Sequence, residues 1–201
     1  MKTTKPLFLL LLLVFIGIDK LSAQEAPAGM TAIEAITSRV SIREYTDQKG
    51  PREALENIVR AGMAAPSAMN KQPWQFIILD DTDILKSIGE KLPTSAMAQR
   101  APAAILVCGD LTKTGQGWQE EYWIQDCSAA SQNILLAITE LGLGGVWTSI
   151  YPADNRIKIG AEVLGLPDHI VPLNIIPVGY PSGENQPKDK WNEEMAHWNK
   201  W

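Results

Sequence analysis

The chain has 201 residues, of which 45% are apolar and 20% charged, values that are ordinary for a globular protein. The length suits one domain with a sizeable core, and no repeat, low-complexity block or long linker divides it. A formal net charge of -5 argues against wholesale nucleic-acid binding, although a local basic pocket for one phosphate is compatible with it.

The N-terminus has the order of a secretory signal peptide. Lys2 and Lys5 precede an uncharged, mostly apolar run, residues 7–18, and a small-residue stretch follows it. As a helix this run would rise about 18 Å, too short for a bilayer core of about 30 Å. We therefore expect residues 1–23 to be a cleaved signal, residues 24–201 to be an exported, periplasmic domain, and no membrane span to remain. An uncleaved anchor and a buried N-terminal helix are the alternatives.

Hydrophobic periodicity and turn residues predict helices and strands that alternate along the rest of the chain. Helices are expected over residues 31–38, 51–64, 84–92, 120–141 and 153–164. Strands are expected over residues 74–79, 103–108, 145–150 and 170–178, with 40–45 extended, 65–73 and 111–118 as loops and 180–201 as a polar tail. The helix at 120–141 is apolar or small almost all round, which is typical of a central helix. The order predicts an α/β or α+β fold with a sheet covered on its faces.

The chain contains two cysteines, Cys108 and Cys127. Their spacing is not that of a redox motif or of a metal site, so we expect two buried thiols and no metal. Export would permit a disulfide, but the sequence alone cannot bring the two sulfurs together.

Residues 39–43 have the composition of an anion site. In an extended segment Arg39, Ser41 and Arg43 share one face, while Val40 and Ile42 point toward the core. Two guanidinium groups that flank a hydroxyl suit phosphate oxygens, because arginine offers forked donors. The alternative is an ordinary solvated edge strand.

The loop at 65–73 carries Pro66, Ser67, Ala68, Asn70 and Gln72 between a helix and a strand. Hydroxyl and amide groups at a loop tip suit a heterocycle with donors and acceptors on its edge. A turn that uses proline and asparagine only for their backbone preferences is the alternative.

Two later segments are weaker candidates for ligand contacts. Glycines at 142, 144 and 145 allow close backbone approach just before Thr148 and Ser149, although they do not match the Rossmann fingerprint. Lys188 and Lys190 in the tail would complete a phosphate pocket, or form a solvated charge run.

Together, in this order and spacing, these segments resemble the nitroreductase family of FMN-dependent flavoproteins. The resemblance runs from about residue 32 to 201 and is carried by "SRVSIREY", "APSAMNKQPWQF", "QDCSAASQNILLAITELGLGGVW" and "PVGYPSGENQPKDKW". It implies an α+β three-layer sandwich, with a central mixed or antiparallel sheet flanked by helices and a long central helix. It also implies an interlocked homodimer in which both subunits build each active site.

The resemblance implies a role for each candidate residue. Arg39, Val40 and Ser41 would hold the FMN phosphate and ribityl chain, and Arg43 would lie near the pyrimidine edge of the ring. The loop would reach the flavin from the other subunit, and the backbone of Thr148 and Ser149 would lie beside the ring. The full expected cofactor set is Arg39, Val40, Ser41, Arg43, Pro66, Ser67, Ala68, Asn70, Thr148, Ser149, Lys188 and Lys190.

The activity implied is a ping-pong hydride transfer from a reduced donor, with NAD(P)H as the family's usual choice, to nitroaromatics, quinones or similar small acceptors. The flavin N5 carries this chemistry and Arg43 tunes it, so no catalytic side chain is expected. The two histidines, His169 and His197, accordingly have no partner typical of nucleophilic catalysis. An exported member would meet little NAD(P)H, so another donor stays open. The alternatives are an FMN-binding protein without turnover, a dehalogenase, and a flavin-cleaving enzyme.

Overall fold

A computed structural model describes residues 29–183 and 185–201 of the chain. The expected signal peptide at 1–23 lies outside these residues, so its cleavage stays a prediction. Among the residues described, no helix combines the length and the apolar character needed to cross a bilayer.

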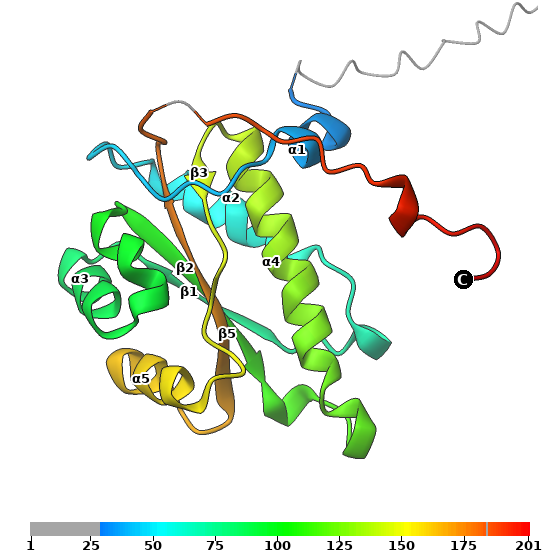
Figure 1. Ribbon diagram of the computed structural model, residues 1–201. Coiled ribbons are helices and arrows are strands. Elements are labelled where there is room, and N and C mark those ends of the chain that lie inside the picture. The colour runs from blue at the N-terminus through cyan, green and yellow to red at the C-terminus, as the bar shows by residue number, and fades with distance from the viewer. Residues whose placement is uncertain (1–28, 184) are drawn as a thin grey trace, which may run out of the picture.

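A five-stranded sheet forms the middle layer of the molecule (Figure 1). Its strands are β1 (Trp74–Leu79), β2 (Ala103–Asp110), β3 (Gly144–Gly145), β4 (Thr148–Ser149) and β5 (Ile170–Gly179). They follow the order β1-β2-β5-β3, β4 also pairs with β5, and every strand pair is antiparallel. Every residue of β2 is buried, because helices cover both faces of the sheet.

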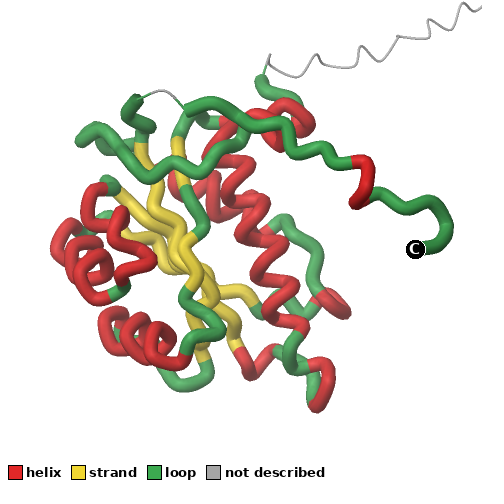
Figure 2. The backbone as a smooth tube through the Cα atoms, viewed as in Figure 1, coloured by secondary structure: helices red, strands yellow, loops and turns green. Residues whose placement is uncertain are grey.

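Helices form the outer two layers. On one face lie α1 (Ala32–Ser38), α2 (Arg52–Met63) and α4 (Tyr122–Glu140), and on the other lie α3 (Thr82–Lys91) and α5 (Asp154–Leu164) (Figures 1 and 2). Each face has its own apolar core, one around α4 and one around α3 and α5. The expected α+β three-layer sandwich with a long central helix is therefore confirmed, and its sheet is antiparallel.

The predicted elements occur in the predicted order, with one difference. The strand expected over 145–150 is divided into β3, which pairs with the C-terminal end of β5, and β4, which pairs with the middle of β5 at Asn174 and Ile175. The segment at 40–45 is extended, as expected, and forms isolated bridges instead of a regular strand, from Ser41 to Gly145 of β3 and from Tyr45 to Pro181 beyond the end of β5. The Ser41 bridge to Gly145 is parallel, whereas all the strand pairs are antiparallel.

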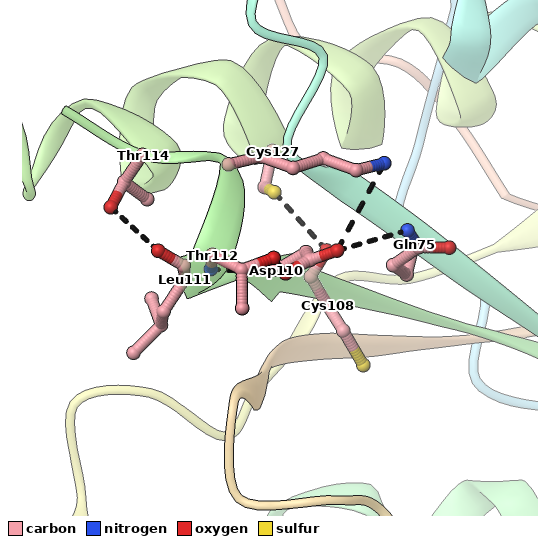
Figure 3. A network of polar contacts seen from close by, with 8 residues as sticks. Gln75, Cys108, Asp110, Leu111, Thr112, Thr114 and Cys127 are labelled. Atoms are coloured by element: carbon pink, nitrogen blue, oxygen red, sulfur yellow. Dashed lines mark hydrogen bonds and ion pairs between the residues drawn. The ribbon is translucent and has the colours of Figure 1, made fainter.

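The two cysteines lie on opposite faces of the sheet. Cys108 packs in the core under α3 and α5, and Cys127 packs in the core under α4. The Cys127 thiol donates a hydrogen bond to the Cys108 carbonyl oxygen at 3.3 Å (Figure 3), so the strand backbone stands between the two sulfurs. Both thiols are free, and a disulfide would require the backbone to move.

Candidate functional site

A hollow at one end of the sheet brings together the basic residues singled out in the sequence. It has a volume of about 360 Å³ and is open to solvent. We call it the cation groove; it is lined by Arg39, Val40, Ser41, Arg43, Asn185, Gln186, Lys188 and Lys190. Four of these residues are basic, and no Asp or Glu is among the described residues that line it. Such a donor set fits a phosphoryl group.

Backbone contacts hold the 39–43 segment against the sheet. The Ile42 N–H donates to the Gly145 carbonyl oxygen at 3.0 Å, and the Ile42 side chain is buried. Ser41 and Arg43 on either side of Ile42 are exposed, as the expected alternation requires. Val40 differs from the expectation, because it is only half-buried and lines the groove instead of entering the core fully.

A glycine is needed where this segment meets β3. A Cβ added at Gly144 would lie 2.7 Å from the Cβ, Cγ1 and Cγ2 atoms of Ile42, closer than such atoms approach in folded proteins. The Tyr45 hydroxyl fixes the segment further by donating to the Ile42 carbonyl oxygen at 2.7 Å. The groove wall is thus rigid at Ile42, between two of its candidate phosphate ligands.

The arginines of the groove are available for an anion. Glu44, the nearest acidic residue in sequence, pairs with Arg100 at 2.9 Å and not with Arg43. Arg43 donates a hydrogen bond to the Ser41 carbonyl oxygen at 3.4 Å. Among the carboxylates that the structure describes, none forms an ion pair with Arg39 or Arg43.

The loop with Pro66, Ser67, Ala68 and Asn70 lies elsewhere in the same chain. Its Ala68 N–H donates to the Asp126 carboxylate in the first half of α4, at 2.8 Å. The cation groove lies beyond the other end of α4, near Gly145. At a rise of 1.5 Å per residue, the helix separates Asp126 from its C-cap at Leu141 by about 22 Å. Within one protomer the structure therefore does not bring the loop to the groove.

Thr148 and Ser149 lie on the segment that leads away from the groove along β5. The Thr148 hydroxyl is buried between the Ile175 carbonyl oxygen and the Ser95 hydroxyl, at 2.7 and 2.8 Å, so this side chain serves the fold. Ser149 is exposed, and its carbonyl oxygen accepts a hydrogen bond from Arg156 at 3.3 Å. From Gly145 to Ser149 an extended chain advances about 13 Å.

Sequence reasoning missed three residues that the structure brings into view. Asn185 and Gln186 line the cation groove, and their position beside Lys188 in a polar tail was a usable signal. Asp126 lies on the buried face of α4, near Trp123, Cys127 and Ala130, and it is only 6% exposed. Buried carboxylates are rare, so an aspartate within a helix predicted to be central was a usable signal.

The structure is thus an α+β three-layer sandwich with a groove whose basic residues fit a phosphoryl group. In the described part of the chain no three His, Cys, Asp or Glu side chains gather as metal ligands would. The Nitroreductase family model matches residues 36–99 and 89–180, and the chain belongs to this family.

Relatives and solved structures agree with this assignment. The chain is 41% identical over 174 residues to a protein of Methanothermobacter thermautotrophicus that carries the name NADH dehydrogenase/NAD(P)H nitroreductase, covering 86% of this chain and 88% of the relative. A crystal structure under the same name from Parabacteroides distasonis superposes with a TM-score of 0.80 at 46% identity, covering 85% of this chain and 98% of the other. FMN reductase [NAD(P)H] of Bacillus subtilis is 25% identical, over 82% of this chain and 72% of its own length.

Proposed function

We propose that this protein transfers a hydride from a reduced donor to a small acceptor such as a nitroaromatic or a quinone. Membership of the nitroreductase family makes it an FMN-dependent oxidoreductase. FMN, when bound, supplies the hydride chemistry, so the protein contributes binding, orientation and electrostatics. The donor, the acceptor and the order in which they bind are the parts that we propose.

The observation that carries the proposal is the cation groove. FMN ends in a phosphate, and Arg39, Lys188 and Lys190 offer it positive charge from two distant parts of the chain. The Ser41 hydroxyl adds a neutral donor between the arginines. Hydrogen bonds between charged groups contribute about 1.5–3 kcal/mol each, enough to retain a cofactor that is not covalently attached.

We further propose that the protein works as a homodimer. The 66–70 loop and the cation groove of one protomer lie toward opposite ends of α4, too far apart for one FMN to contact both. The loop would therefore contact the FMN bound by the partner subunit. Apolar residues exposed on α1 and in the tail give such a dimer a surface to bury. Their exposed fractions are 69% for Ile33, 50% for Ile36, 90% for Trp198 and 102% for Trp201.

For the reaction order we propose a ping-pong scheme, in which donor and acceptor occupy the same site one after the other. The names of the relatives cited above point to NADH or NADPH as donor. An exported protein would meet little of either, so a different donor is the main alternative. Export itself is proposed from the N-terminal pattern, and mass spectrometry of the mature N-terminus after cell fractionation tests it.

The test of the function is an absorption spectrum of the purified mature protein with FMN added, followed by anaerobic titration with NADH and NADPH. We expect a bound-flavin spectrum that bleaches with a donor and returns when a quinone or nitroaromatic is added. A colourless protein that ignores FMN would refute the function. A coloured protein that no donor bleaches would favour an FMN-binding protein without turnover, and loss of the flavin spectrum under oxygen would favour flavin cleavage.

A further inference from the structure

We propose that Asp126 is a positioning residue, whose carboxylate holds the 66–72 turn in the shape needed to cover the flavin of the partner subunit. The inference rests on the proposed function, because the turn is assigned to the flavin there. Asp126 itself touches neither the cation groove nor its lining residues.

The first support is the setting of the carboxylate. Asp126 lies on α4 with only 6% of its surface exposed, next to buried Trp123, Cys127 and Ala130 on the same helix. No Lys, Arg or His is paired with it among the residues described. Burial raises the pKa of Asp126, because a charged carboxylate loses its hydration there.

An unpaired carboxylate in an apolar helix face lowers the stability of a fold, and an apolar residue of similar volume would raise it. The described contacts give Asp126 one hydrogen bond, from the Ala68 N–H at 2.8 Å. The role of the carboxylate therefore lies in this hydrogen bond, which holds Ala68 and the 66–72 turn.

The second support is the shape of that turn. Met69, Asn70 and Gln72 have φ angles of 51°, 54° and 49°, in the left-handed region that residues other than glycine rarely adopt. Internal hydrogen bonds hold part of the turn, such as the one from the Gln72 N–H to the Ser67 hydroxyl at 3.0 Å. Of the described hydrogen bonds made by residues 66–72, the one to Asp126 is the bond that reaches outside the turn.

The third support is the sequence distance that this contact spans. Ala68 and Asp126 are 58 residues apart, and α4 is the central helix of one core. The contact thus fixes an exposed turn with left-handed backbone angles against the long helix that packs at the centre of this core. Residues 66–70, which face a ligand in the proposed dimer, take their position from this single anchor.

The first experiment compares two variants of the full mature protein that remove the charge. Asp126→Asn keeps an oxygen acceptor for the Ala68 N–H, whereas Asp126→Leu keeps the branched shape of the side chain and removes the acceptor. We expect Asp126→Leu to weaken FMN binding by about tenfold, as loss of one hydrogen bond to a charged group implies, and Asp126→Asn to stay within about twofold of wild type. Melting temperature should not fall in either variant, because both relieve the buried charge.

Asp110 supplies a matched control. It is also buried, at 7% exposure, but its carboxylate accepts from Thr112 within its own turn and from Gln75 on β1 at 3.5 Å (Figure 3), and it lies 3.9 Å from Lys113. Asp110→Leu should lower the melting temperature and leave the FMN dissociation constant unchanged. If Asp126→Leu does not fold, Asp126→Ala takes its place in the comparison.

The second experiment tests which flavin the turn serves. A mixed dimer is prepared from differently tagged chains, one carrying Arg39→Ala and the other Asp126→Leu. If the turn acts on the partner, both defects fall on one site, and the mixed dimer keeps one site of wild-type FMN affinity. If the turn acts within its own chain, both sites are damaged and no such site remains.

The outcomes separate the two proposals. A wild-type protein that does not bind FMN refutes the proposed function. A wild-type protein that binds FMN, together with an Asp126→Leu variant of unchanged affinity, refutes the role of Asp126 alone. Equal losses in Asp126→Asn and Asp126→Leu also refute it, since the acceptor would then be irrelevant.

Discussion

Arg39 is the residue whose loss should weaken cofactor binding most directly. It is half-buried in the cation groove and forms no ion pair with any described carboxylate, so its charge is available to a phosphate. Arg39→Ala should raise the FMN dissociation constant about tenfold to a hundredfold, measured by quenching of flavin fluorescence. Arg52→Ala, which removes an exposed arginine paired with Asp80 outside the groove, should leave it unchanged.

Arg43 should affect the reduction potential more than the affinity. A positive charge near the flavin favours the anionic reduced form over the neutral oxidised form. Arg43→Ala should therefore lower the two-electron potential, by about 30 mV for each 1.4 kcal/mol of lost interaction. Dye-coupled spectroscopic titration measures the potential, and Arg43→Lys, which keeps the charge, should restore most of it. An unchanged potential in Arg43→Ala would remove this role.

Asp126 makes the stability of the fold depend on pH in an unusual direction. Because burial raises its folded pKa above the usual value of 3.8, the folded state binds a proton more tightly than the unfolded state. Proton binding at Asp126 therefore stabilises the folded state at low pH, and this stabilisation is lost as the pH rises from the unfolded to the folded pKa. Asp126→Asn should thus gain stability over wild type between about pH 3 and pH 7 in urea unfolding. A gain that grows as the pH falls would contradict the assignment.

At the scale of elements, the contact between residues 39–43 and β3 is the most sensitive to substitution. Gly144→Ala would press a methyl group against Ile42, displace the groove wall and weaken both folding and FMN binding, at a cost to stability of about 1–3 kcal/mol. Gly160→Ala in α5 is the control. Its Cβ would meet no atom closer than 3.5 Å, and helix propensity favours alanine by up to about 1 kcal/mol. Thermal unfolding and FMN titration of both variants measure the contrast.

The elements also show how much of the structure could be predicted from local sequence patterns. The strand at 74–79 was predictable at both ends, because apolar residues and Pro73 define it locally. The 40–45 segment was predicted correctly as extended, but whether it joins a ladder depends on Gly145, far away in the chain. Arg39, Ser41 and Arg43 follow from alternation in sequence. No local sequence pattern indicates that these residues lie beside Lys188 and Lys190, because tertiary structure brings them together. The same holds for the hydrogen bond between Ala68 and Asp126.

At the scale of the whole molecule, the C-terminal tail exposes large apolar side chains that a dimer would bury. It runs past α1 and away from the body of the domain (Figure 1), and Trp191, Met195, Trp198 and Trp201 are all at least 74% exposed. Deleting residues 192–201 keeps Lys188 and Lys190 but removes most of this apolar surface. We expect the dimer dissociation constant to rise by at least about tenfold in sedimentation velocity, with an unchanged circular dichroism spectrum. A wild-type chain that sediments as a monomer would contradict the dimer.

The placement of Cys108 and Cys127 on opposite faces of the sheet has a consequence for how the chain matures. Burial raises the pKa of Cys108 to about 12 and raises that of Cys127 as well, so neither sulfur is a thiolate at neutral pH. Folding then needs no disulfide-forming oxidant or disulfide isomerase, even where secreted proteins usually acquire crosslinks. An alkylating reagent would reach either sulfur only when the sheet separates from its helices, so the labelling rate at these positions reports how often the interior opens.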